Sequence, residues 1–241
     1  MGKLSKGFSM IMLASLLTLA GCGSNSETSS NGSGESDSEN SKGDTYTIGI
    51  SQYVNHPSLD AATKGFKKAI EESGLKVKYV EQNAQGDANN AKTAAQNLVN
   101  GDVDLIFANA TPSAQAAAGA TSDIPIVFTS VTDPVGAELV QSMESPGGNV
   151  TGTADMHPDS IPNTIKFIDE HMDAKTVGTI YNAGEQNSVK QIDVMKKALK
   201  DTDLKLVEKV VSNTSEVKQA ADSLAGSVDV IYIITDNTVV S

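Results

Sequence analysis

Two patterns of apolar residues alternate along the chain from residue 45 to residue 241. Short runs such as TYTIGIS (45–51) predict buried strands, and longer segments with apolar residues at helical spacing, such as SLDAATKGFKKAIEES (58–73), predict amphipathic helices. Regular alternation of the two implies parallel sheets with helices on both faces, so the predicted fold class is α/β. The remaining strands are predicted at 76–81, 104–108, 124–130, 150–155, 176–181, 204–211 and 228–235, and the remaining helices at 87–100, 112–120, 160–172, 188–201 and 214–226.

The two halves of this region resemble each other in sequence. GFKKAIEESGLKV (65–77) matches VMKKALKDTDLKL (194–206), and LVNGDVDLIFA (98–108) matches LAGSVDVIYII (224–234). We interpret this similarity as two copies of one βαβαβ plan, and therefore as two doubly wound parallel-sheet lobes. The second copy stops earlier than the first, which predicts that the second lobe is truncated at its C-terminus and has an uncovered sheet edge.

The first 44 residues contain no such alternation. Residues 1–22 have the layout of a secretory signal, with Lys3 and Lys6 before an apolar run that ends in small residues. LTLAGC (17–22) is similar to a bacterial lipobox, which makes Cys22, the single cysteine, the predicted lipidation site; a cleaved signal with an incidental cysteine is the alternative. Residues 23–44 have no apolar side chain to bury, so we expect a disordered tether.

The overall charge limits which partners the protein can have. The formal net charge is −12 and the pI is about 4.6, which argues against nucleic acid or an anionic membrane surface as the main partner.

The predicted organisation of the chain has four parts. They are a signal peptide with lipobox (1–22), a tether (23–44), an N-terminal α/β lobe (45–150) and an incomplete C-terminal α/β lobe (151–241).

Polar residues follow several predicted strands. In open α/β sheets ligands bind beyond the carboxyl ends of the strands. The segments at these positions include NATPS (109–113), VTDP (131–134), YNAGEQNS (181–188) and TDN (235–237). Their accumulation at one end of both halves favours a binding site, although such residues also cap helices and form turns.

Helix starts in these loops predict where the charged ends of a ligand bind. We expect Thr111 before Pro112 and Asp133 before Pro134 to be N-caps, and Ser188 with Gln191 to form a capping box. Helix N-termini attract a carboxylate, and the neighbouring acidic residues suit an ammonium, so the site would accept a zwitterion such as an α-amino acid. These acidic residues are Asp133, Glu185 and Asp236.

Aromatic residues and candidate catalytic groups give weaker signals. Tyr53 and Tyr181 fall at strand ends, where each ring either covers an apolar ligand side chain or belongs to the core. The three histidines, His56, His157 and His171, lack the spacing of a metal site, and the chain has no nucleophile elbow, phosphate-binding loop or CxxC motif. We therefore predict no enzyme activity, no metal and no cofactor.

Several segments resemble the substrate-binding lipoproteins of ABC importers, in the branch similar to the tryptophan- and tyrosine-binding proteins. The similarity is carried by IGISQYVNHPSLD (48–60), FANATPSAQAA (107–117), FTSVTDPVGAELV (128–140), GNVTGTAD (148–155), IYNAGEQNS (180–188) and IITDNTV (233–239).

The resemblance implies two lobes of the type I periplasmic binding protein fold that close over a ligand. It also implies delivery of the ligand to a membrane permease driven by a separate ATPase, and a lipid-anchored position on the outer face of the bacterial cytoplasmic membrane. Alternatives are a sensory module that signals to a membrane receptor kinase, and a secreted hydrolase that uses cleft carboxylates. The ligand contacts implied by the resemblance are Asn109, Thr111, Ser113, Thr132, Asp133, Asn187, Ser188 and Asp236, with Tyr53 and Asn182 nearby.

Overall fold

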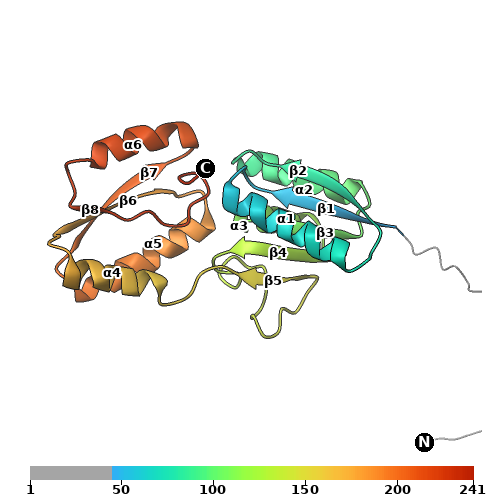
Figure 1. Ribbon diagram of the computed structural model, residues 1–241, viewed down its shortest axis with the longest axis horizontal. Coiled ribbons are helices and arrows are strands. Elements are labelled where there is room, and N and C mark those ends of the chain that lie inside the picture. Colours follow the sequence, from blue (N-terminus) through green and yellow to red (C-terminus); the bar gives the residue numbers. More distant parts are fainter. Residues whose placement is uncertain (1–44) are drawn as a thin grey trace, which may run out of the picture. The chain divides into compact units, whose positions relative to one another are not determined.

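The computed structural model describes residues 45–241, which lie in one compact unit of residues 42–241 (Figure 1). The predicted signal peptide, Cys22 and the tether fall outside the described residues. No helix within residues 45–241 combines the length and the apolar character needed to cross a bilayer.

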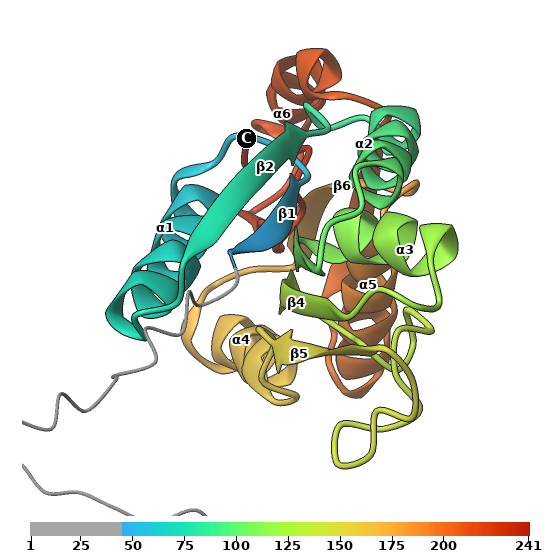
Figure 2. The same cartoon turned by 90° about the vertical axis from the view of Figure 1, so that its right-hand side faces the viewer.

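The first sheet has five parallel strands in the order β2-β1-β3-β4-β5. Helix α1 covers one face, and α2 and α3 cover the other (Figures 1 and 2). The apolar residues of α2 and α3 pack against β3 and β4, while Phe66 of α1 stacks on Phe107 of β3. The elements are β1 (Tyr46–Gln52), α1 (Pro57–Glu72), β2 (Val77–Asn83), α2 (Ala88–Asn100), β3 (Leu105–Asn109), α3 (Thr111–Ala120), β4 (Ile126–Val131) and β5 (Val150–Ala154).

The second sheet has three parallel strands in the order β7-β6-β8. Helices α4 and α5 pack on one face and α6 on the other (Figure 1). The elements are α4 (Ser160–His171), β6 (Thr176–Asn182), α5 (Gln186–Ala198), the short 3₁₀ helix η1 (Leu199–Asp201), β7 (Lys205–Val211), the short 3₁₀ helix η2 (Thr214–Glu216), α6 (Val217–Leu224) and β8 (Val230–Ile231).

The two sheets repeat one plan in detail. The chain passes through β1, α1, β2, α2 and β3 in the same spatial order as through β6, α5, β7, α6 and β8. A Cβ atom at Gly49 of β1 would lie 3.0 Å from Leu98, and one at Gly178 of β6 would lie 2.9 Å from Val228 and 3.2 Å from Leu224. Equivalent glycines therefore let equivalent helices approach the central strand, which confirms the predicted βαβαβ repeat.

Two sequence-based predictions need correction. The strand predicted at 150–155, nearly all of which lies within the predicted C-terminal lobe (151–241), is β5 and pairs with β4 at the edge of the first sheet. The lobe boundary at residue 150 remains a prediction, but this pairing shows that the first sheet extends to Ala154. The strand expected over 228–235 is only β8, because the backbone of Thr235 bonds the side chain of Gln191 in α5 instead of continuing the ladder.

Candidate functional site

A cavity of about 400 Å³ lies where the carboxyl ends of the first-sheet strands face the segment that follows β8. The lobe that contains the first sheet contributes the start of α1, the end of β4 and the residue after β5. The lobe that contains the second sheet contributes the first turn of α5 and the segment after β8. Ligands of open α/β proteins bind in this position relative to the strands. The lining residues are His56, Ser58, Leu59, Ser130, Thr132, Asp155, Asn187, Ile233, Ile234, Thr235, Asp236, Asn237 and Val240.

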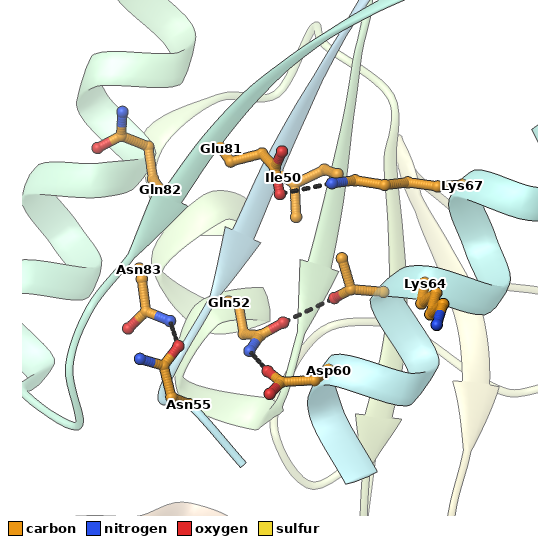
Figure 3. A pocket seen from close by; sticks show the side chains of 10 residues that line it. Ile50, Gln52, Asn55, Asp60, Lys64, Lys67, Glu81, Gln82 and Asn83 are labelled. Atoms are coloured by element: carbon orange, nitrogen blue, oxygen red, sulfur yellow. Dashed lines mark hydrogen bonds and ion pairs between the residues drawn. The ribbon is translucent and has the colours of Figure 1, made fainter. Parts of the chain in front are cut away.

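A second cavity, of about 420 Å³, lies between α1 and the edge strand β2 (Figure 3). Its polar side chains already pair with one another: the Gln52 amide donates to Asp60 at 2.6 Å, and Lys67 binds Glu81 at 2.6 Å. The hydroxyl of Thr63 also donates to the Gln52 oxygen at 2.7 Å. Since one sheet lines this cavity and most of its polar side chains pair with one another, the cavity beside β4 and α5 is the better candidate site.

The loop after β6, YNAGEQNS, binds a later part of the chain. Glu185 is 1% exposed, and one of its carboxylate oxygens accepts hydrogen bonds from the backbone and the hydroxyl of Thr238 at 3.0 and 2.7 Å. Its other oxygen accepts bonds from the backbone and the amide of Asn237 at 3.2 and 2.6 Å. Burial, together with the negative charge of Asp236, raises the pKa of Glu185 above the usual value. The loop therefore fixes residues 237–238 in place.

The side chain of Asp236, in the segment after β8, also binds the loop after β6 and the start of α5. Its carboxylate accepts bonds from the backbone of Asn182 at 2.6 Å, the hydroxyl of Ser188 at 2.7 Å and the backbone of Val239 at 2.8 Å. The capping box expected from Ser188 and Gln191 is therefore wrong. Helix α5 begins at Gln186, and both side chains bind the chain after β8; the Gln191 amide also donates to the backbone oxygen of Asn187, but neither side chain caps a free N–H of the helix start.

The loop after β3 makes fewer side-chain bonds to other parts of the chain. Buried oxygens of three side chains, the Asn109 carbonyl and the Thr111 and Ser113 hydroxyls, have no hydrogen-bond partner within the described residues. The Asn109 amide group is held in one orientation because its nitrogen donates to the backbone oxygen of Leu59 and the hydroxyl of Thr63. The first turn of α3 thus carries unused hydrogen-bonding capacity.

Thr111 is not the N-cap that the sequence predicted. The N-cap of α3 is Ala110, which makes no side-chain bond, and Thr111 is the first helical residue. Ala110 has φ +88°, a left-handed conformation that is strained for a residue with a Cβ atom. Ser130, at the end of the neighbouring strand β4, also has a positive φ of +56° and lines the cavity. Two strained residues therefore lie at adjacent strand ends.

Asp133 connects the first sheet to α5. One carboxylate oxygen lies 2.8 Å from the ammonium of Lys190, and the other accepts the backbone N–H of Gly136 at 3.0 Å. Burial works against ionisation, but these two hydrogen bonds outweigh it and lower the pKa of Asp133. The N-cap expected at Asp133 is corrected to the cap of a short turn, since no helix starts here.

Neither candidate tyrosine lines the cavity. Tyr53 is 2% exposed, packs among Leu59, Ala84 and Ala91, and donates its hydroxyl to the backbone oxygen of Gly86 at 2.9 Å. Burial raises its pKa, and so do the charges of Glu185, Asp87 and Asp236, in that order of size. Tyr181 donates its hydroxyl to Glu208 at 3.1 Å. Tyr53 therefore has the core role that the sequence left open, and Tyr181 is partly buried against the core beneath α4 and α5.

The structure divides the predicted ligand contacts into two groups. Three of them line the cavity: Thr132, Asn187 and Asp236. The other predicted contacts do not line it: Tyr53, Asn109, Thr111, Ser113, Asp133, Asn182 and Ser188.

His56 and Asp155 line the cavity without having been predicted as ligand contacts. The His56 ring accepts the backbone N–H of Ser58 through Nδ1 at 3.2 Å, so in the neutral ring Nε2 carries the proton and is a donor. Asp155 directly follows β5, and its backbone N–H donates to Val131 at 3.1 Å. Both residues stand at strand ends or helix starts, which is the sequence signal that could have identified them.

Within residues 45–241, no three His, Cys, Asp or Glu side chains come together closely enough to hold a metal ion.

Comparison with known proteins gives one consistent family. Residues 47–241 match the family model described as ABC transporter substrate binding protein. The chain is 46% identical to a tyrosine-binding protein of Clostridioides difficile strain R20291, over 98% of this chain and 70% of the relative. It is 35% identical to an ABC domain from Streptococcus pneumonia solved in complex with L-Trp, over 82% of this chain and 68% of that chain, with a TM-score of 0.75.

A third comparison bears on conformation. The ligand-free, open structure of a substrate-binding protein with adhesive properties from Clostridium difficile shares 44% identity, over 80% of this chain and 67% of that chain. Its TM-score is only 0.54, so the chain is closer in structure to the L-Trp complex in spite of the lower identity there. Solved structures at 18% and 17% identity, with TM-scores of 0.59 and 0.57, share the fold alone, and it is the predicted type I periplasmic binding protein fold.

Proposed function

Because the chain belongs to the family of ABC transporter substrate-binding proteins, we propose that it is the solute-binding component of an ABC importer. We propose that its ligand is an α-amino acid with an aromatic or other apolar side chain. The tyrosine-binding relative and the structure solved with L-Trp support this ligand class.

The composition of the cavity is the observation that carries the proposal. Apolar side chains line part of it, and polar side chains from different elements line the rest. A volume of about 400 Å³ is in the range of small-molecule sites, which are mostly apolar with a few well-placed polar groups. An amino acid has the same division between an apolar side chain and a polar head. The apolar residues are Leu59, Ile233, Ile234 and Val240, and the polar ones include His56, Thr132, Asp155 and Asn187.

A ligand that touches both lobes would stabilise the closed state, because an open state offers contacts from one lobe only. Thr132 and Asn187 would touch such a ligand from opposite sides. The unused buried oxygens of α3 would give its head group additional partners as the lobes move. We therefore propose Thr132 and Asn187 as direct contacts, Asn109, Thr111 and Ser113 as head-group contacts, and Tyr53, Asp133, Asn182, Ser188 and Asp236 as residues that support the site.

The partners and the location follow from the family and the N-terminal sequence. We propose that the protein is anchored to the outer face of the cytoplasmic membrane through a lipid on Cys22 and passes its ligand to a permease with a separate ATPase. Labelling of cells with a fatty-acid analogue tests the anchor. The wild-type protein should carry the label and sediment with membranes, and Cys22→Ser should do neither. Equal labelling of both forms would contradict the anchor.

The ligand is tested by a thermal-shift screen of the full-length protein against the common amino acids, followed by calorimetry. A true ligand at 100 times its Kd adds about 2.7 kcal/mol of stability and should raise Tm by several degrees. We expect the largest shifts with L-tyrosine or L-tryptophan, and we expect the ligand to be recovered unchanged. A shift with a sugar or a purine and with no amino acid would contradict the proposal, and conversion of the ligand would favour a hydrolase.

A further inference from the structure

One ion pair joins the two lobes of the protein. The carboxylate of Asp133, in the loop after β4, lies 2.8 Å from the ammonium of Lys190 in α5. No other ion pair within residues 45–241 connects the first sheet and its helices with the second sheet and its helices. The pair therefore forms only while α5 lies against the end of the first sheet.

The Asp133 carboxylate is oriented by its own loop. Its Oδ1 accepts the backbone N–H of Gly136 at 3.0 Å, and its Oδ2 faces Lys190. Gly136 also makes room for this arrangement, since a Cβ atom at that position would collide with the carboxylate. Because the acceptor is already held, forming the pair orders mainly the lysine side chain, and this lowers the entropic cost of the contact.

Neither member of the pair lines the cavity. The side chain of Lys190 is 42% exposed and that of Asp133 is 18% exposed, so water can hydrate both when the lobes separate. The structure in which the pair forms has a TM-score of 0.75 with the L-Trp complex and of 0.54 with the open, ligand-free structure. The pair thus distinguishes a closed from an open arrangement of the lobes without touching a ligand.

We propose that Asp133 and Lys190 form a latch that stabilises the closed state and slows the release of the ligand. The latch rests on the proposed function, because its effect on release requires a ligand that binds between the lobes. A contact that does not touch the ligand shifts the closing equilibrium by the same factor whichever ligand is bound. Partly exposed ion pairs change an equilibrium about two- to fivefold, and we expect an effect of this size.

The first test measures the affinities of L-tyrosine and L-tryptophan for the full-length protein by calorimetry. In Lys190→Met we expect the Kd of both amino acids to rise by the same factor, about two- to fivefold, with faster dissociation of each. The matched control is Lys196→Met. Lys196 lies on the same helix and pairs with Glu208 at 2.9 Å, but within one lobe, so this variant should leave both affinities unchanged.

The second test does not depend on the identity of the ligand. Dyes on Gln96→Cys in α2 and Gln219→Cys in α6, two exposed positions, report the distance between the lobes by energy transfer in the Cys22→Ser background. In the ligand-free protein we expect Lys190→Met to lower the closed fraction and Lys196→Met to leave it unchanged. The difference between wild type and Lys190→Met should disappear in ~1 M salt, which screens the pair.

A double variant shows whether the two residues act together. Asp133→Asn combined with Lys190→Met should lower the closed fraction no further than Lys190→Met alone, since both changes break one contact. Independent losses that add would overturn the latch.

Three other results would also overturn the latch and leave the proposed function standing. They are a closed fraction that is the same in wild type and Lys190→Met, a Kd that rises for one of the two amino acids only, and equal effects in Lys190→Met and Lys196→Met. If no amino acid binds the wild type, the proposed function fails, and the energy-transfer measurement still decides whether the pair holds the lobes together.

Discussion

The loops after β3 and β6 look alike in sequence but differ in how their hydrogen-bonding groups are used. Both follow a buried strand, both are rich in Asn, Ser and Thr or Glu, and both lead into a helix. In the β6 loop the Glu185 carboxylate is bound by residues 237 and 238, and Ser188 by Asp236, although the buried amide oxygens of Gln186 and Asn187 have no partner within the described residues. In the β3 loop, buried oxygens of Asn109, Thr111 and Ser113 have no partner within the described residues.

This difference shows that polarity at a strand end has two distinct uses. Side chains that bind a distant part of the chain, as Glu185 and Ser188 do, fix that part in place, and a change there should lower stability. A loop with unused capacity contributes little to stability and is available to a ligand, so a change there should lower affinity. The following experiments test this contrast, from the largest expected effect to the smallest.

Glu185→Ala should lower the free energy of unfolding by about 3–5 kcal/mol, because it leaves the buried donors of Asn237 and Thr238 without an acceptor. Urea denaturation followed by circular dichroism measures the change. Glu170→Ala, at an exposed position in α4, is the control and should change stability by less than about 0.5 kcal/mol. A similarly small effect at Glu185 would remove the distinction between the loops.

Asp236→Asn should cost about 2 kcal/mol of stability, because an amide nitrogen replaces an oxygen that accepts bonds from the chain. The same denaturation experiment measures it, and Asp222→Asn, on the exposed surface of α6, is the matched control. We expect any loss of ligand affinity in Asp236→Asn to follow the loss of stability. A variant of wild-type stability that no longer binds would instead assign Asp236 to the ligand.

Thr111→Val and Ser113→Ala should have the opposite profile. Each removes a buried hydroxyl without a partner, so stability should stay within about 1 kcal/mol of wild type, while the Kd for the amino acid found in the screen should rise about tenfold. Calorimetry and denaturation on the same samples separate the two effects. Thr93→Val on α2 is the control for the threonine change. Loss of stability with unchanged Kd would show that the first turn of α3 is structural.

Lys190→Met should have the smallest effect, at most about 1 kcal/mol, because the ion pair with Asp133 is partly exposed and screened by salt. The pKa of Asp133 is lowered in the folded protein, so the pair stabilises the fold above the ordinary carboxyl pKa and loses that effect as pH falls through the lowered folded value. Denaturation at a series of pH values should therefore show the full difference between wild type and Lys190→Met at pH 7, and a difference that shrinks as pH falls below the ordinary carboxyl pKa. A difference that does not change with pH, or that is unaffected by high salt, would contradict this role.

Much of the fold could be predicted from the sequence because it depends on local patterns. The spacing of apolar residues identified every strand and helix of the described region, and the similarity of 98–108 to 224–234 identified the repeat that Gly49 and Gly178 then confirmed. The exceptions are elements whose outcome depends on distant contacts. Strand β8 ends early because Gln191 binds Thr235, and β5 joins the first sheet because β4 offers an open edge.

The candidate site was predicted less well. The sequence indicated the correct end of the strands and named three of the residues that line the cavity, but it missed His56 and Asp155 and assigned capping roles to Thr111 and Ser188 that the structure does not show. The reason is that a polar side chain has a limited number of hydrogen bonds, and its partner is the group that folding brings nearest. For Glu185 and Asp236 those partners lie up to 54 residues away.

By itself the sequence determined which segments are strands and helices, that one plan occurs twice, and that polar groups gather at one end of both sheets, because these properties follow from local residue order. Only the tertiary structure decided which of those polar groups are satisfied by the chain and which remain available, because hydrogen-bond partners are assigned by distance in space.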